Sequence, residues 1–159
     1  MAKRSAGLLL FRESPRGVEV LLVHPGGPFW AKKDEGAWSI PKGEFDDDED
    51  ALVAARREFE EETGATAPDG ETFALDPVRQ PSGKVVHAWA IRGDFDPEHL
   101  TSNTFSMEWP PRSGRSADFP EVDRAEWFSW DRALIKMQKG QRPILDQLRA
   151  LLESESTRG

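Results

Sequence analysis

The sequence predicts an α/β domain, in which short strands form a sheet layered between two helices, one on each side. Three observations predict this class: strand-length apolar segments bounded by turn residues, one acidic segment with helix-terminating signals, and a C-terminal segment with leucines at helical spacing. The chain has 159 residues, a length typical of one domain with a substantial core. We expect one domain over residues 1–153 and a disordered tail over 154–159.

The strands are predicted from apolar runs between turn residues. Two such runs, 5–11 and 18–23, open the chain, and the polar residues between them predict a hairpin with a longer loop. A Gly/Pro-rich stretch follows at 24–30, and 38–40 predicts a short strand that Pro41 ends. Further strands are expected at 72–78, 84–91, 103–109 and 125–130.

The two helices have different signatures. Residues 47–63 are predicted to be helical because Asp46 is a suitable N-cap, Glu49 follows three residues later, and Gly64 provides the stop. The second helix is expected over about 142–152, where apolar residues recur at helical spacing.

Composition excludes several classes of protein. There is no cysteine, which excludes disulfides and thiolate chemistry, and no apolar run approaches the ~20 residues of a membrane span. The formal net charge is −8, and residues 44–62 hold ten acids and two bases, so the remainder is balanced. Overall acidity argues against binding a nucleic-acid polymer, whereas this local cluster of acids argues in favour of binding cations. We expect a cytoplasmic protein without a membrane partner.

Three carboxylates share one face of the predicted acidic helix. Glu58, Glu61 and Glu62 have the spacing i, i+3, i+4, and like charges at this spacing repel each other. A solvated acidic face is one interpretation. The other is a site for a hard divalent cation, Mg²⁺ or Mn²⁺, because such ions prefer oxygen ligands.

The spacing around these carboxylates favours the second interpretation. Residues 43–65 resemble the Nudix box, G-x5-E-x7-R-E-U-x-E-E-x-G-U, at every fixed position, with Ala65 small for the last apolar place. The chain is therefore identified as similar to the Nudix hydrolases. This resemblance implies a mixed sheet sandwiched between helices and a divalent-cation-dependent enzyme. The metal ligands that it implies are Glu58, Glu61, Glu62 and the Gly43 carbonyl.

The resemblance also implies a reaction. Nudix hydrolases cleave a phosphoanhydride bond in a nucleoside diphosphate linked to another group, so the expected partner is a small nucleotide. The segment 38–43, W-S-I-P-K-G, resembles the W-x-[LI]-P-K-G lead-in of enzymes that act on dinucleoside polyphosphates. We therefore favour a dinucleoside polyphosphate or a (d)NTP as substrate. The alternatives are a nucleotide sugar or another diphosphate as substrate, or a non-catalytic nucleotide-binding regulatory module. A homodimer is expected as the oligomeric state.

The remaining candidate residues lie around the box. Arg57 is expected to orient a carboxylate, and Glu121 is the candidate general base, with Glu108 as its rival. Lys42, Trp30 and Arg112 are the candidate substrate-binding residues, through phosphate contact or base stacking. For each of them, a solvated loop position or core packing is the alternative.

Overall fold

A computed structural model describes residues 3–158 of the chain. Its strands are β1 (Arg4–Ser14), β2 (Gly17–Pro25), β3 (Lys42–Glu44), β4 (Thr72–Ala74), β5 (Val78–Arg79), β6 (Val85–Arg92), β7 (Thr104–Glu108), β8 (Ser116–Pro120) and β9 (Val122–Ser129). Its helices are α1 (Ala51–Thr63), α2 (Trp130–Lys136), α3 (Arg142–Arg158) and the short 3₁₀ turns η1 (Pro97–His99) and η2 (Lys139–Gln141).

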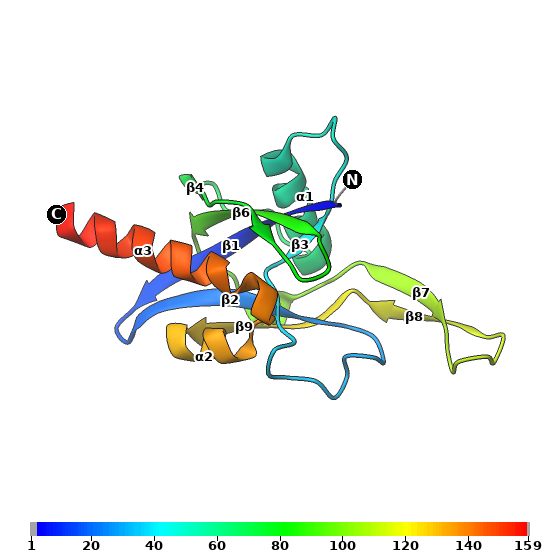
Figure 1. Cartoon of the computed structure of the whole chain (residues 1–159). Helices are drawn as coiled ribbons and strands as arrows, with labels where there is room; N and C mark the ends of the chain where they lie inside the picture. The colour runs from blue at the N-terminus through cyan, green and yellow to red at the C-terminus, as the bar shows by residue number, and fades with distance from the viewer. Residues whose placement is uncertain (1–2, 159) are drawn as a thin grey trace.

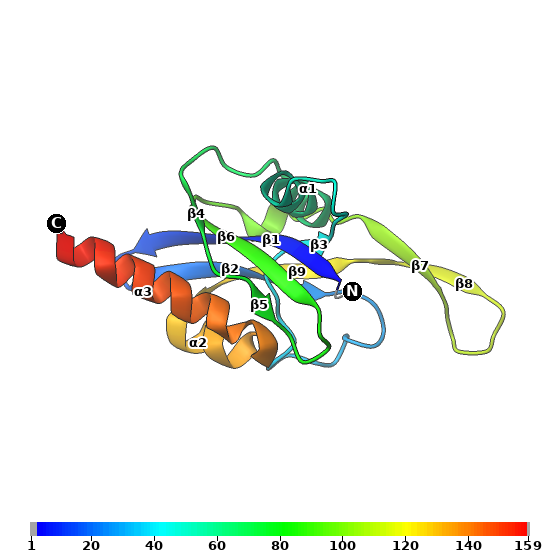
Figure 2. The ribbon, with the colours of Figure 1, turned by 45° about the horizontal axis from the view of Figure 1, so that its top comes forward.

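One mixed sheet forms the centre of the molecule. Its strand order is β4-β6-β1-β2-β9, with β3 beside β1 and β5 beside β6. Strand β1 runs parallel to β6 and antiparallel to β2 and β3. Helix α1 covers one face, whereas α2 and α3 cover the other (Figures 1 and 2). The predicted fold class, a mixed sheet sandwiched between helices, is confirmed.

Alternation along β1 divides the core into two layers. Leu8 and Leu10 point towards α1 and pack with Phe59, whereas Leu9 and Phe11 point towards α2 and α3. All four leucine and phenylalanine side chains of β1 are fully buried, which fixes the register of the central strand.

Several element boundaries differ from the predictions. The first hairpin has a tight turn, because β1 and β2 pair as far as Ser14 and Gly17, where Gly17 adopts a φ of 115°. The ion pair between Arg12 and Glu19 keeps this polar end in the ladder. The predicted strand at 38–40 makes only isolated bridges, and the strand β3 begins after Pro41.

Helix α1 begins later than predicted. Its N-cap is Asp50, whose Oδ2 accepts a hydrogen bond from the Val53 N–H at 3.0 Å, so the Asp46 cap was wrong. Residues 46–49 instead form the loop before the helix. Helix α3 extends beyond the predicted end into residues for which the sequence predicts a tail, and the domain boundary at 153 stays a prediction.

Strands β7 and β8 form a separate two-stranded hairpin that projects from the body of the molecule (Figure 1). We call residues 104–120 the arm. Phe105 and Phe119 are paired across it with their ring centroids 6.0 Å apart. Two main-chain bonds hold the base of the arm: the Asn103 N–H donates to the Glu61 carbonyl at 2.9 Å, and the Glu121 N–H donates to the Asn103 carbonyl at 2.8 Å.

Candidate active site

Helix α1 places the box carboxylates beside the sheet. Gly64 ends the helix in the left-handed region, with a φ of 81°, and its N–H caps the Glu60 carbonyl. The face that buries Phe59 also turns Glu58 and Glu62 inward, so these two residues are only 8% and 9% exposed. Glu61 lies on the outer part of this face, with a side chain that is 40% exposed.

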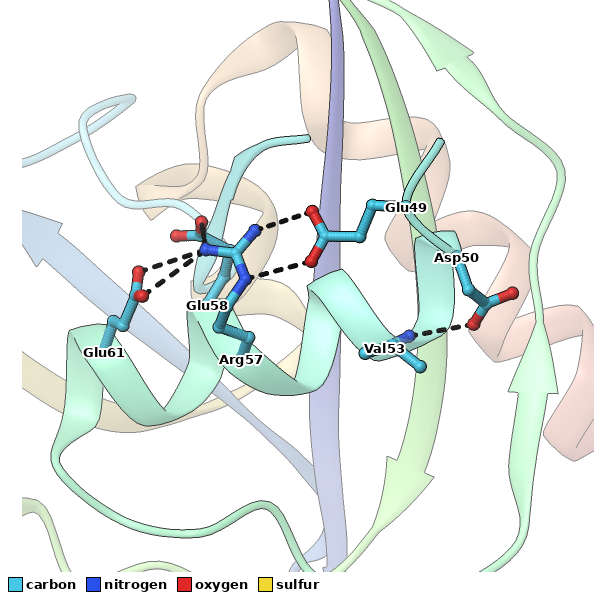
Figure 3. A network of polar contacts seen from close by, with 6 residues as sticks. All are labelled: Glu49, Asp50, Val53, Arg57, Glu58 and Glu61. Carbon is cyan, nitrogen blue, oxygen red and sulfur yellow. Dashed lines mark hydrogen bonds and ion pairs between the residues drawn. The ribbon is translucent and has the colours of Figure 1, made fainter. Parts of the chain in front are cut away.

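Arg57 connects the carboxylates to the loop before the helix (Figure 3). Its guanidinium makes two hydrogen bonds to Glu49, of 3.1 and 3.0 Å, in a bidentate pair. Nη1 of the same side chain also lies 2.8 Å from Glu58 Oε1 and 3.4 Å from Glu61 Oε1. The hydrogen bonds to Glu49, ahead of the charges of Glu58 and Glu49, raise the pKa of Arg57. Arg57 therefore contacts three carboxylates, and its role in orienting them stays a prediction.

Strand β3 lies directly against these carboxylates. A Cβ atom at Gly43 would lie 2.0 Å from Glu58 Oε2, so the Glu58 carboxylate occupies the space that any other residue would fill. The Lys42 N–H donates a hydrogen bond of 3.3 Å to Glu62 Oε1. Glycine is thus required at position 43 because the main chain there lies against the Glu58 carboxylate.

The two inward carboxylates are destabilised as anions. Burial, followed by the charge of Glu58, raises the pKa of Glu62 to about 8. Burial and the charge of Glu61 raise the pKa of Glu58, although Arg57 opposes this effect. Glu121 adds to both shifts, which places its charge near Glu58 and Glu62.

This donor set suits a hard divalent cation. Buried carboxylates that repel each other are stabilised as anions by a cation, and all of their donor atoms are oxygens. Within residues 3–158, no three His, Asp or Glu side chains converge closely enough to form a ready-made metal cluster. Glu58 and Glu61 instead contact Arg57. Glu58, Glu61, Glu62 and Gly43 as metal ligands stay a prediction.

A cavity of about 220 Å³ opens beside the inward carboxylates. Glu62, Glu121, Lys42 and Trp30 all line it, so the structure brings four of the predicted site residues together. Burial lowers the pKa of Lys42, as does the nearby charge of Lys84, whereas Glu62 opposes the shift. Glu121, which is exposed, lies on the wall of this cavity. Two carboxyl groups, a lysine and an aromatic ring thus line one cavity beside helix α1.

The chain matches the family model described as the NUDIX domain over residues 1–148. The chain belongs to the Nudix family. Two relatives are an 8-oxo-(d)GTP phosphatase of Mycolicibacterium smegmatis, 32% identical over 148 residues, and an RNA pyrophosphohydrolase of Caulobacter vibrioides, 46% identical over 99 residues. These matches cover 85% and 58% of this chain but only 37% and 49% of the relatives. The chain therefore spans half the length of these relatives or less.

Solved structures share the Nudix fold. A C. elegans Ap4A hydrolase binary complex has a TM-score of 0.66 and 21% identity, over 94% of this chain and 98% of that one. The NUDIX domain of Shewanella oneidensis NrtR, solved with ADP ribose, has a TM-score of 0.65 and 18% identity, over 96% and 89%. The described part of this Nudix chain contains no helix long and apolar enough to cross a membrane.

Two predicted residues lie away from the Nudix carboxylates. Arg112 is exposed at the tip of the arm, where it has a positive φ of 63°, and the tip lies far from α1 (Figures 1 and 2). The carboxylate of Glu108, the rival base, accepts the Arg112 N–H at 2.7 Å. This contact places Glu108 at the arm as well. The substrate-binding role of Arg112 stays a prediction without support from its position.

Two buried polar residues near the Nudix site have no signal in the sequence. His24 is fully buried, and its ring nitrogens lie 2.7 Å from Asp123 Oδ1 and 2.7 Å from the Lys33 carbonyl oxygen. It thereby holds the Gly/Pro-rich loop that contains Trp30 against strand β9. The other residue is Gln141, which is also fully buried. Their partners are distant in sequence, so only an alignment that shows them covarying with those partners could have indicated them.

Proposed function

We propose that this protein is a divalent-cation-dependent pyrophosphohydrolase that cleaves a phosphoanhydride bond in a nucleoside diphosphate-linked substrate. The observation that carries the proposal is the cavity in which Glu62 and Glu121 face the same space as Lys42 and Trp30. The family membership and the complete set of box acids support it.

Glu58, Glu61, Glu62 and the Gly43 carbonyl would hold the cation, with Mg²⁺ or Mn²⁺ as the candidates. When bound, such an ion neutralises phosphate charge and lowers the pKa of a water ligand. The chain supplies the remaining chemistry. Lys42 presents its ammonium to the phosphates from the cavity wall. Trp30, whose ring has the Lys33 ammonium 5.1 Å from its centroid, offers a surface on which a base can stack.

Glu121 is the proposed general base. A base must lie within hydrogen-bond reach of the attacking water in the substrate complex. Glu121 faces the cavity from the base of the arm, whereas Glu62 is buried and bonded to the Lys42 N–H. Glu121 is thus free to accept the proton while Glu58 and Glu62 serve as ligands. Arg57 keeps its bidentate pair with Glu49 and so holds the start of the box in place.

We favour a (d)NTP, including oxidised forms, or a dinucleoside polyphosphate as substrate. A relative whose match covers 85% of this chain is named an 8-oxo-(d)GTP phosphatase, which supports a nucleoside triphosphate. The lysine in the segment before the box supports a substrate with several phosphates, because an ammonium contacts phosphate as a point charge. A cytoplasmic location and a homodimer stay predictions.

A nucleotide panel tests the proposal. The protein is incubated with Mg²⁺ and, separately, with 8-oxo-dGTP, dGTP, diadenosine tetraphosphate, ADP-ribose and a nucleotide sugar. Released phosphate, pyrophosphate and mononucleotides identify the bond that is cleaved. Nucleotide binding without cation-dependent hydrolysis of any of these compounds would instead indicate a non-catalytic regulatory module.

A further inference from the structure

Gln141 lies in η2, near the C-terminal end of the domain, and is fully buried although its side chain is polar. A buried amide is costly unless its hydrogen bonds are made, so the groups that it contacts are fixed in place. Those groups belong to the segment just before the box, about 100 residues earlier in the chain.

The side-chain amide of Gln141 reaches both main-chain polar groups of one residue, Ile40, one directly and the other through Ser39. Oε1 accepts a hydrogen bond of 3.1 Å from the Ile40 N–H, and Nε2 donates one of 2.9 Å to Ser39 Oγ. Ser39 Oγ in turn donates to the Ile40 carbonyl at 2.7 Å. Gln141 thus satisfies the Ile40 N–H directly and the Ile40 carbonyl through the serine hydroxyl.

The same segment reaches the carboxylates two residues later. The Lys42 N–H donates to Glu62 Oε1 at 3.3 Å. The carbonyl of Pro41, which lies between Ile40 and Lys42, accepts the Leu8 N–H at 3.3 Å. The side chains that hold residues 39–42 are Gln141 at one end and Glu62 at the other, in addition to the main-chain bonds between Ser39 and Val23 and the pairing of Lys42 with strand β1. Ser39, Ile40 and Lys42 line the cavity that also contains Glu62 and Glu121.

We infer that Gln141 is a positioning residue that places the cavity wall at 39–42, and with it Lys42, relative to Glu62. This inference rests on the proposed function for its effect on hydrolysis. Gln141 contacts no substrate in this role. It acts through the main-chain groups of Ile40, so its loss loosens the cavity wall between the Ser39–Val23 bonds and the pairing of Lys42 with β1, while those main-chain bonds and the bonds of α1 remain.

The chain offers a matched control in Gln147. On α3, its Oε1 accepts the Asp76 N–H at 2.6 Å and its Nε2 donates to the Asp76 carbonyl at 3.1 Å. Gln147 therefore uses both ends of its amide to hold the main-chain N–H and carbonyl of one loop residue, but it does not line the cavity. Gln141→Met and Gln147→Met each remove these contacts with little change in side-chain volume.

The test combines amide hydrogen exchange, followed by NMR, with steady-state kinetics on diadenosine tetraphosphate and Mg²⁺. For Gln141→Met we expect exchange at Ile40 and Lys42 to rise at least about 10-fold, and kcat/KM to fall about 10-fold, mainly through KM. Gln147→Met is expected to change neither. Ser39→Ala keeps Gln141 and provides a second variant, with a smaller rise in exchange at the same two amides.

The inference would be overturned if Gln141→Met and Ser39→Ala both left exchange at Lys42 unchanged and raised exchange only at Ile40. Unchanged KM in Gln141→Met, when the wild-type protein hydrolyses the substrate, would also overturn it. If the wild-type protein hydrolyses none of the nucleotides, the proposed function fails. The exchange at Lys42 then still decides whether Gln141 positions this wall.

Discussion

Gly43→Ala is expected to inactivate the enzyme while leaving it folded. The new Cβ would lie 2.0 Å from Glu58 Oε2, whereas ordinary contacts begin at 3.4 Å, so the carboxylate must retreat by about 1.4 Å. A misplacement of about 1 Å at a reacting centre costs about 10²-fold in rate. We therefore expect kcat/KM to fall at least about 10²-fold, or ~2.7 kcal/mol. The melting temperature should change little, because the displaced group is the far end of a flexible side chain and the main chain is not forced to move.

The assay compares Gly43→Ala with Gly70→Ala, using Mg²⁺-dependent nucleotide hydrolysis and thermal unfolding for both. Gly70 is a suitable control because its Cβ would meet the Arg92 carbonyl oxygen at 3.6 Å, an ordinary contact. Gly70→Ala should keep both activity and melting temperature. A kcat/KM for Gly43→Ala within threefold of wild type would refute the reasoning, since Glu58 would then tolerate displacement.

Three further substitutions test other parts of the molecule. Glu62→Gln should raise the melting temperature of the metal-free protein, because burial and the charge of Glu58 destabilise the ionised form of this carboxyl group, and should lower hydrolysis by about 10²-fold; wild-type turnover would argue against the metal-site assignment. Lys42→Ala should lower kcat/KM by about 10- to 100-fold, with the greater loss for substrates that have more phosphates. If kcat/KM for diadenosine tetraphosphate and for a nucleotide sugar is the same in Lys42→Ala as in wild type, Lys42 does not bind phosphate. Burial and the charge of Arg4 lower the pKa of His87 in the folded state, so its contribution to stability is complete above pH 6.5 and is lost as the pH falls below that value. His87→Phe should therefore reduce the loss of stability between pH 7.5 and 5.5 in denaturant titrations, and an unchanged pH dependence would contradict this.

The parts of the fold that follow local rules could be predicted from the sequence. Gly64 ends α1 where expected, and the apolar alternation of β1 and β2 identifies the central strands. The predicted start of α1 was wrong because several acids there are suitable caps; Asp50 makes the cap, and Asp47 and Glu49 in the loop before it pair with Arg4 and Arg57. Strand β8 was missed because its segment, 116–120, is short, polar and ends in proline, so that its alternation becomes apparent only beside Phe105.

The candidate site shows the same division. The box spacing was sufficient to predict Glu58, Glu61 and Glu62, because they share one helix face regardless of the rest of the chain. Glu121 lies just before β9, which brings it to the cavity that Glu62 also lines, and its role as the base stays a prediction. Gln141 and His24 could not be predicted, since buried polar residues are recognised by partners that the fold brings from far along the sequence.

The way in which the arm is attached determines which changes in its length and sequence the fold can accept. Its base is held to Glu61 and Glu121 by peptide groups, so these attachments do not depend on the identity of any side chain in the arm. Hairpin length and tip composition are therefore free to change while the carboxylates keep their positions. Because one end of the arm leads directly into Glu121, each change in length would reshape the approach to the cavity from the side of the proposed base. The same hydrolytic centre can in this way be fitted to leaving groups of very different bulk.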